Sequence, residues 1–298
     1  MKRSAATDLE IFEAHRALLV AHAYRMLGDL ARAEDVVQDA WLRWSGPHEP
    51  AVSPRAYLIT MVTRLCFTEL DSARARREES RGDRLPEPVD LDDVGLGRVE
   101  MLDRVSMAFL VVLQRLTAAE RAVLLLRDVF DFEYREIAAL LGKSEAACRK
   151  LLERARDDVA REKRLFSTSP EAHRRLLTAF TEAAAAGDLE ALVSMLAEDA
   201  VLITDGGAEG RRVGRFRNLQ APLQGARNIA AFITATAGSA QGLEVEIREL
   251  NGQPSAVFYR GDTPFAALLL GATDDRIHRV FFQADVERLR GLGRRRPL

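Results

Sequence analysis

Basic side chains line one face of a helix that the sequence predicts after Ser144. Guanidinium and ammonium groups at helical spacing can donate hydrogen bonds to base edges and to phosphates, and each good pairing with a base discriminates by about 1–3 kcal/mol. Arg149 and Lys150 stand where base or phosphate contacts are expected, whereas Arg154 and Arg156 are better suited to phosphate. The full set predicted to meet DNA is Glu145, Arg149, Lys150, Arg154 and Arg156.

A helix-turn-helix between residues 128 and 156 would hold these side chains in place. Gly142 ends a short first helix where a left-handed backbone costs little, and Ser144 caps the second helix. Apolar residues at helical spacing predict the buried sides of the two helices. They are Ile137, Leu140 and Leu141 in the first, and Cys148, Leu151, Leu152 and Ala155 in the second. One such motif is also compatible with an ordinary helical hairpin in a protein core.

A second candidate surface is acidic. Residues 30–44 predict an amphipathic helix whose apolar side includes Leu30, Val37 and Trp44. Its other side gathers carboxylates and an amide, which could bind a partner but in most proteins form only a solvated surface. The residues of this acid/amide face are Glu34, Asp35, Gln38 and Asp39.

The next predicted helix starts at Ser53 and Pro54, a cap followed by proline in the first turn, and it ends in the basic run SARARR. Arginines there could follow a phosphate backbone. Tyr57 and Phe67 could stack on unpaired bases, although core positions suit both better. The candidate cations of this helix are Arg64, Arg74, Arg76 and Arg77.

Beyond residue 171 two predicted helices, the second capped by Asp188, precede the strand-like segments VLIT, LEVEIREL, SAVFYR, FAALLLG and RIHRVFF. This order predicts an α+β domain with antiparallel strands. Asp199 and Asp205 are its candidate bases for proton abstraction, and Tyr259 is its single tyrosine. Both aspartates fall in turn-like sequence, where aspartate commonly bends the chain, so we expect no catalytic residue.

Length, charge and residue composition restrict the functions that this chain can have. A length of 298 residues allows two or three domains, and a net charge of −2 is unusual for a protein that holds DNA unaided. We therefore expect weak DNA binding that a partner strengthens. The two cysteines lie on apolar helical faces and the five histidines are scattered, so we expect reduced thiols, no metal site and no cofactor. The lack of a long apolar run or secretory signal predicts a cytoplasmic protein without membrane contact.

Three stretches together closely resemble the bacterial extracytoplasmic-function (ECF) sigma factors: YRMLGDLARAEDVVQDAWLRW, PRAYLITMVTRLC and LTAAERAVLLLRDVFDFEYREIAALLGKSEAACRKLLERAR. The resemblance covers roughly Leu9 to Arg164 and implies two all-α sigma domains. It implies that the acid/amide face docks on the clamp helices of the RNA polymerase β′ subunit. It also implies that the helix from Pro54 to Arg77 recognises and helps melt the −10 element. The helix after Ser144 would read the −35 element, with its domain on the β flap.

The stretch LLTAFTEAAAAGDLEALVSMLAEDAVLITDGG is similar to the start of a SnoaL-like domain, an α+β cone whose relatives include polyketide cyclases and ketosteroid isomerase. A sigma factor with this extra domain resembles the SigJ-type subgroup, in which the domain takes the place of a separate anti-sigma protein. The resemblance implies regulatory contacts at Asp205, Gly206 and Gly207 and near Asp285, although both motifs are altered in this chain. It leaves open a small-molecule ligand inside the cone.

We therefore expect a multidomain protein. Its segments are sigma domain 2 at 8–80, a linker at 81–98, sigma domain 4 at 99–164 and a SnoaL-like regulatory domain at 171–292. The leading hypothesis is an alternative sigma factor, not an enzyme, that binds core RNA polymerase and promoter DNA and is regulated by its own C-terminal domain. The alternatives are a one-component helix-turn-helix regulator with a ligand-sensing domain, and a cyclase or isomerase with a DNA-binding tether.

Overall fold

The chain forms two compact units. The computed structural model describes residues 5–47, 51–75, 84–96, 106–163, 168–207, 212–213, 216–217, 219, 221–236, 242–273 and 275–295. The first unit comprises Met1–Ser80, Gly95–Arg104 and Leu110–Ala160, and the second comprises Arg81–Val94, Val105–Phe109 and Arg161–Leu298. The second unit thus includes residues that precede the helix-turn-helix in the sequence.

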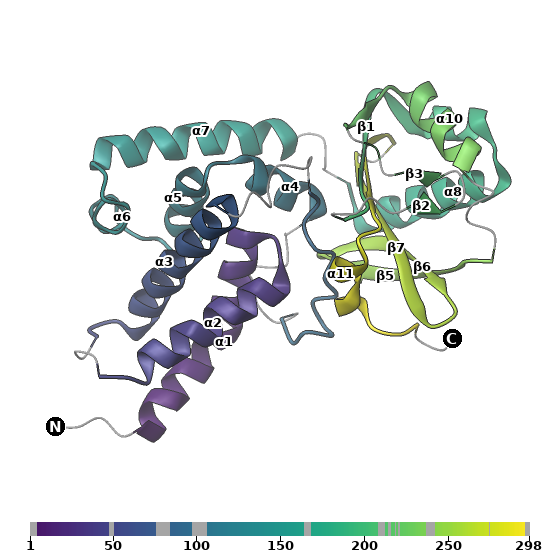
Figure 1. Ribbon diagram of the computed structural model, residues 1–298. Helices are drawn as coiled ribbons and strands as arrows, with labels where there is room; N and C mark the ends of the chain where they lie inside the picture. The colour runs from purple at the N-terminus through teal and green to yellow at the C-terminus, as the bar shows by residue number, and fades with distance from the viewer. Residues whose placement is uncertain are drawn as a thin grey trace. The chain divides into compact units, whose positions relative to one another are not determined.

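The first unit is built from helices (Figure 1). A left-handed backbone at Gly28 (φ 71°) separates the first two helices, and Asp29 then caps the second by accepting a hydrogen bond from the Arg32 amide at 3.0 Å. Thr117 and Glu120 form a capping box at a later helix start. The helices are α1 (Ala5–Leu27), α2 (Leu30–Trp44), α3 (Pro54–Ala75), α4 (Met107–Arg115), α5 (Ala118–Asp128), α6 (Tyr134–Leu141) and α7 (Glu145–Lys163), with parts of α4 and α7 reaching into the second unit.

Helices α1 to α3 and helices α5 to α7 belong to one packed unit. Arg121 of α5 is 4% exposed and donates hydrogen bonds to the carbonyl of Met26 at the end of α1 and to the Gln114 side chain. Phe130, after α5, meets His22 of α1 edge-on, with ring centroids 4.9 Å apart. A buried arginine and an aromatic pair therefore join the two helical groups.

The second unit has the α+β fold expected of the cone, and each of the five predicted strand segments overlaps a strand, with only Leu243 and Arg276 lying just before theirs (Figure 1). Its six-stranded sheet has the order β4-β1-β8-β7-β6-β5. The strands are β1 (Leu196–Asp205), β4 (Leu223–Gln224), β5 (Glu244–Leu250), β6 (Gln253–Arg260), β7 (Thr263–Ala272) and β8 (Ile277–Gln283), with β2 (Arg212–Val213) and β3 (Phe216–Arg217) in a separate ladder. The helices are α8 (Pro170–Ala186), α9 (Leu189–Met195), α10 (Ala226–Thr236) and α11 (Val286–Leu289), followed by the 3₁₀ turn η2 (Arg290–Leu292).

The sheet is mixed, which corrects the expectation of an antiparallel domain. Strand β1 runs parallel to β8, with Asp205 opposite Gln283, because the chain passes through α10 and the three strands β5 to β7 before it returns. Sequence reasoning also missed α10 as a helix. Helices α8 and α10 cover one face of the sheet, where Phe180, Ile229 and Val280 belong to one buried core.

Candidate functional site

The acid/amide face lies on one exposed side of α2. The opposite side of α2 is buried, from Leu30 through Val37 to Trp44, and this burial turns the polar residues outward. Glu34, Asp35, Gln38 and Asp39 are all exposed. The structure therefore brings together the four residues that the sequence singles out as a partner surface.

Helix α3 carries the second predicted surface. Arg64 is exposed, and Arg74 lies near the end of the helix, whereas Arg76 and Arg77 lie outside the described residues. Tyr57 is 40% exposed, and its ring rests against Trp44 with centroids 5.8 Å apart. The preference for a core position is therefore wrong for Tyr57, because Trp44 fills the core below it. Phe67 is half-buried.

Helices α6 and α7 form the predicted helix-turn-helix. Gly142 adopts a φ of 62°, and the Ser144 hydroxyl accepts a hydrogen bond from the Ala147 amide at 3.2 Å. Ile137 and Leu152 are buried between the helices and their neighbours. The candidate DNA contacts Glu145, Arg149, Lys150, Arg154 and Arg156 are all exposed.

Two of these exposed cations are already paired. Arg149 donates to Glu145 at 2.9 Å and lies over the Tyr134 ring. Arg156 makes two hydrogen bonds to the Asp128 carboxylate, at 2.6 and 3.0 Å, and these bonds raise the pKa of Arg156. Exposed ion pairs contribute about 0.2–1 kcal/mol, so a phosphate could displace either one at modest cost.

The two cysteines are poorly suited to nucleophilic chemistry. Cys66 and Cys148 are free and buried, and burial raises the pKa of both thiols, which makes them weak nucleophiles. Within the described ranges, no group of three or more histidine, cysteine or acidic side chains is arranged to hold a metal ion. Every helix in the part of the chain that the structure describes is too short or too polar to cross a bilayer.

Residues 84–94 of the expected linker are bound to the second unit's sheet. The Leu85 side chain is buried, its amide donates to the Asp205 carboxylate at 2.9 Å, and its carbonyl accepts from Arg288 at 2.8 Å and from Gln283 at 3.5 Å. Buried backbone groups need such partners, because an unpaired one costs about 1–3 kcal/mol. We call this bound segment and its partners the linker clamp.

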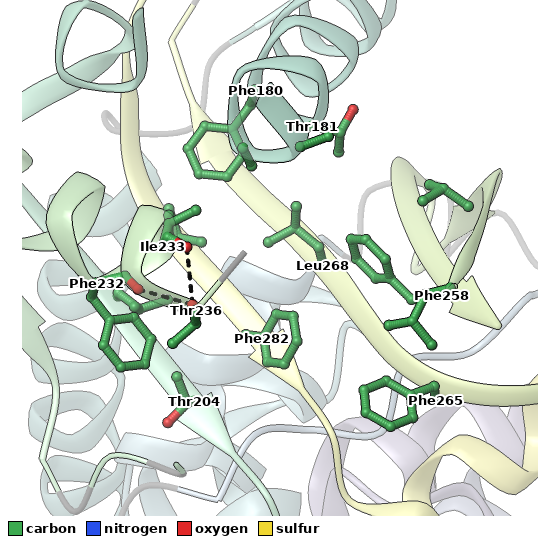
Figure 2. Close-up of a pocket in the computed structure, with 16 residues that line it drawn as sticks. Phe180, Thr181, Thr204, Phe232, Ile233, Thr236, Phe258, Phe265, Leu268 and Phe282 are labelled. Atoms are coloured by element: carbon green, nitrogen blue, oxygen red, sulfur yellow. Dashed lines mark hydrogen bonds between the residues drawn. The ribbon is translucent and has the colours of Figure 1, made fainter. Parts of the chain in front are cut away.

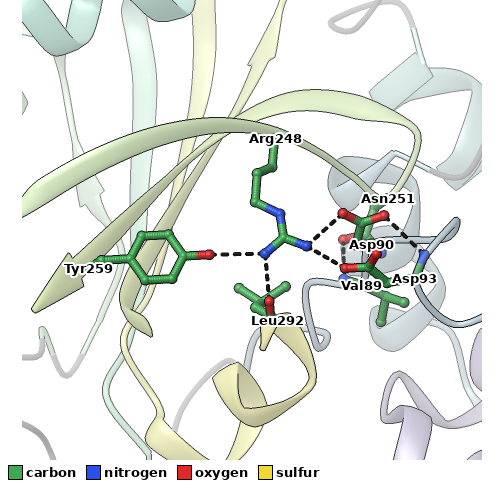
Figure 3. Close-up of polar contacts among 7 residues, drawn as sticks. All are labelled: Val89, Asp90, Asp93, Arg248, Asn251, Tyr259 and Leu292. Carbon is green, nitrogen blue, oxygen red and sulfur yellow. Dashed lines mark hydrogen bonds and ion pairs between the residues drawn. The ribbon is translucent and has the colours of Figure 1, made fainter. Parts of the chain in front are cut away.

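Arg248 of β5 lies at the middle of the linker clamp (Figure 3). Its guanidinium donates to Asp90 at 2.7 Å and to Asp93 at 2.6 Å, both in the linker, and also to the Tyr259 hydroxyl at 2.9 Å. Burial disfavours the charged guanidinium, but the hydrogen bonds outweigh this and raise the pKa of Arg248. The Arg248 guanidinium therefore stays positively charged, and its charge compensates the negative charge of the buried Asp90 carboxylate.

A backbone pairing completes the clamp beside Arg248. The Val89 amide donates to the Asn251 side-chain oxygen at 3.1 Å, and the Val89 carbonyl accepts from the Asn251 amide at 2.8 Å (Figure 3). Further along, the Met107 amide donates to the Gln253 side chain at 3.3 Å. Sequence reasoning missed Arg248, Asn251, Gln253 and Arg288, because strand periodicity alone does not distinguish them from other polar residues in strands or at chain ends.

The candidate regulatory residues meet at the adjacent ends of β1 and β8. The Asp205 carboxylate accepts the Gly207 amide at 3.0 Å, and the Asp205 carbonyl accepts the Ala284 amide at 2.6 Å. Gly207 has a φ of 79°, and a Cβ there would lie 2.8 Å from the Asp285 carboxyl group. Only glycine fits this approach. The structure thus brings Asp205, Gly206, Gly207 and Asp285 together, against the end of the clamp.

A cavity of about 220 Å³ lies between the covering helices and the sheet of the second unit. The residues considered for catalysis do not line it. The Asp199 side chain is 83% exposed, Asp205 faces the linker, and the Tyr259 hydroxyl binds Arg248. Both aspartates lie on β1 and not in separate turns, but Asp199 falls where the register of β1 shifts, and Asp205 ends the strand and accepts the Gly207 amide as expected of an aspartate that bends the chain.

The chain matches two family descriptions, Sigma-70 region 2 over residues 11–76 and Sigma-70, region 4 over residues 106–159. It is 42% identical over 203 residues to the ECF RNA polymerase sigma factor SigJ of Mycobacterium tuberculosis, covering 66% of this chain and 65% of SigJ. It is 30% identical over 303 residues to SigG of the same organism, covering 90% of this chain and 78% of SigG.

A solved structure extends this similarity to both units. The crystal structure of the Mycobacterium tuberculosis ECF sigma factor SigJ matches 95% of this chain and 98% of its own, with a TM-score of 0.70 and 30% sequence identity. The similarity therefore includes the helical unit and the α+β unit.

Proposed function

The chain belongs to the ECF RNA polymerase sigma factors, and we propose from this that it binds core RNA polymerase and directs it to one class of promoters. The observation that carries the proposal is the exposed acid/amide face of α2, followed by the exposed basic face of α7, in a chain that matches sigma-70 regions 2 and 4 in that order. A net charge of −2 fits a protein that relies on polymerase to hold it on DNA. Because a protein that acts on RNA polymerase must meet it in the cytoplasm, we propose a cytoplasmic location.

The proposed roles follow the order of the segments. Sigma domain 2 (8–80) is proposed to bind the clamp helices of β′ and the −10 element, and sigma domain 4 (99–164) to bind the β flap and the −35 element. The linker (81–98) connects these two domains. The C-terminal domain (171–292) regulates the activity of the sigma factor. The acid/amide face supplies the polymerase contact through Glu34, Asp35, Gln38 and Asp39. The DNA contacts proposed for −10 are Arg64, Arg74, Arg76 and Arg77, and those for −35 are Glu145, Arg149, Lys150, Arg154 and Arg156.

Regulation is proposed to act through the linker clamp. Fully extended, the 11 residues of 84–94 span roughly 36–40 Å, and this reach is unavailable while their backbone is bound to the sheet. Release of the clamp would let the two DNA-binding modules separate further. We therefore propose that the C-terminal domain restrains the sigma factor, with Asp205, Gly206, Gly207 and Asp285 at one end of the clamp.

The C-terminal domain is proposed to perform no bond chemistry. Proton abstraction needs a carboxylate inside the cavity, and isomerase-type catalysis also needs a donor for the developing oxyanion. The side chains of Asp199, Asp205 and Tyr259 supply neither, because all three are directed elsewhere.

In vitro transcription with purified core polymerase tests the function. The full chain is expected to start transcription at specific sites in a promoter library, and Asp35→Lys with Asp39→Lys is expected to abolish association with core. Glu10→Lys with Glu13→Lys is the matched control, because it makes the same charge change on exposed positions of α1. Tight binding of operator DNA without polymerase, together with no holoenzyme, would favour a one-component regulator instead.

The regulatory proposal has a separate test. Asp205→Ala removes the acceptor of the Leu85 amide and is expected to raise transcription, whereas Asp262→Ala, in an exposed turn of the same unit, leaves it unchanged. Equal output from the two variants would contradict restraint by the clamp. Truncation after Ser169 is a weaker test, since it also exposes the apolar surface that the clamp buries.

A further inference from the structure

The cavity in the second unit is lined by apolar side chains (Figure 2). Phenylalanines come from both layers, including Phe180 of α8, Phe232 of α10 and Phe282 of β8. Val245, on the rim, is 46% exposed, so the cavity has a route to solvent. Its volume of about 220 Å³ exceeds the roughly 150 Å³ that suffices for benzene in a protein interior. It would hold a molecule of about two rings.

The polar atoms of the lining are already used by the protein. The Thr204 hydroxyl accepts the Leu219 amide at 2.8 Å, the Thr236 hydroxyl donates to the Phe232 carbonyl at 2.8 Å, and the Thr181 hydroxyl donates to the Leu177 carbonyl at 3.0 Å. Among the described residues, the lining holds no charged side chain. Burying an ionised ligand there would be costly, because nothing compensates its charge. The chemistry of the walls therefore selects a neutral, apolar occupant.

The cavity and the linker clamp occupy opposite faces of the same strands. Thr204 and Phe282 are paired across β1 and β8, and both line the cavity. The next pair, Asp205 and Gln283, faces the other way and binds Leu85. Side chains alternate between the faces of a sheet, so a shift of either strand moves both sets together.

A second strand repeats this arrangement. Phe258 of β6 lines the cavity, and the adjacent Tyr259 binds Arg248, which holds the linker aspartates. We propose that the cavity binds a small, neutral, apolar molecule of about two rings, and that its occupancy changes the hold of β1, β6 and β8 on the linker. The second half of this proposal rests on the regulatory role proposed above, whereas the binding half does not.

Binding is tested on the full chain with 6-propionyl-2-dimethylaminonaphthalene, a neutral two-ring probe that fluoresces more strongly in apolar surroundings than in water. We expect saturable enhancement, with displacement by naphthalene but not by naphthoate, which adds one negative charge to the same rings. Ala184→Phe fills the cavity from α8 and is expected to weaken probe binding at least tenfold. Ala186→Phe, exposed at the end of the same helix and outside the lining, is the matched control.

Ile233→Trp fills the cavity from α10 and provides a second test in case Ala184→Phe misfolds. Circular dichroism shows whether each variant is folded. Absence of enhancement, equal displacement by naphthoate, or unchanged binding in both filling variants would overturn the binding half. Coupling is measured by hydrogen exchange of residues 84–94 with and without naphthalene, and unchanged exchange at saturation would overturn the second half. Core association of the chain is a separate measurement, so failure of the sigma function would be recognised independently.

Discussion

Arg248 stands out among single residues because it neutralises linker carboxylates from a buried position. Its side chain is 2% exposed, as against 7% for Asp90 and 43% for Asp93. Removing one partner of a buried ion pair costs about 3–5 kcal/mol, since the other charge stays buried, although solvent screens the Asp93 half.

We predict that Arg248→Met increases hydrogen exchange of residues 84–94 at least tenfold, because about 1.4 kcal/mol of lost protection already gives that factor. Mass spectrometry of the full chain measures it. Arg227→Met is the control, since Arg227 forms an exposed pair with Glu190 at 3.8 Å on the same unit. Unchanged exchange in Arg248→Met would mean that backbone contacts alone hold the linker.

His22 makes the stability of the first unit depend on pH. Burial, with a smaller contribution from Arg25, lowers the pKa of His22 from 6.5 to about 3. Below pH 6.5 the unfolded chain binds a proton that the folded unit refuses until about pH 3. The free energy of unfolding therefore falls as the pH drops through this window, by up to about 1.4 kcal/mol per pH unit.

We predict that His22→Gln flattens this pH dependence between pH 6.5 and 4. Urea unfolding followed by tryptophan fluorescence measures it, because Trp41 and Trp44 both lie in the first unit. His173→Gln is the control: burial lowers the pKa of His173 to about 4, but this residue belongs to the second unit. A steep slope retained in His22→Gln would show that other groups cause the acid sensitivity.

At the scale of elements, the DNA contacts proposed on α7 differ in whether the cation is already bound to a carboxylate of the protein. Arg154 and Arg156 are both exposed, but Arg156 must break two hydrogen bonds to Asp128 before it can bind a phosphate. A phosphate contact by Arg154 would therefore contribute more to the free energy of DNA binding than one by Arg156, although the two residues are close in the sequence.

We predict that Arg154→Ala reduces transcription from a preferred promoter about fivefold, for a loss of about 1 kcal/mol, and that Arg156→Ala reduces it less. Asp128→Asn is expected to increase affinity for promoter DNA, because it frees Arg156. Transcription titrated with holoenzyme provides the measurement, and Glu153→Ala serves as an exposed control on α7. A larger loss from Arg156→Ala than from Arg154→Ala would contradict this ordering.

At the scale of the whole molecule, the packing of α1–α3 with α5–α7 bears on the promoter contacts proposed above. The −10 and −35 elements lie roughly 25 base pairs apart, about 85 Å of duplex at 3.4 Å per pair. Within the first unit Arg121 touches the end of α1 directly. If the two modules bind these elements as proposed, the packed arrangement is a closed one, and the modules have to part before both elements are bound.

We predict that Arg121→Met loosens this packing, because it removes a buried cation from the carbonyl of Met26. Spin labels at Arg43→Cys and Glu153→Cys, both exposed, should then report longer and broader distances. Arg135→Met, exposed on α6, is the control, and an unchanged distance distribution in Arg121→Met would contradict the role of this contact.

Sequence reasoning succeeded where a feature depends on near neighbours in the chain. The caps at Ser144 and Asp188, the left-handed turn at Gly142 and the apolar sides of α2 and α7 all follow from local spacing, and the structure confirms them. It failed on the direction of β1 against β8 and on the exposure of Tyr57, because both depend on segments that meet only after folding.

By itself the sequence determined the helix-turn-helix, the acid/amide face, the α+β character of the C-terminal part and the family. Only the tertiary structure decided that the linker is clamped, that Arg248 holds it, and that a neutral cavity lies on the other face of the same sheet. The reason is distance along the chain. Leu85 and Asp205 are 120 positions apart, and their hydrogen bond exists only because the sheet brings them together.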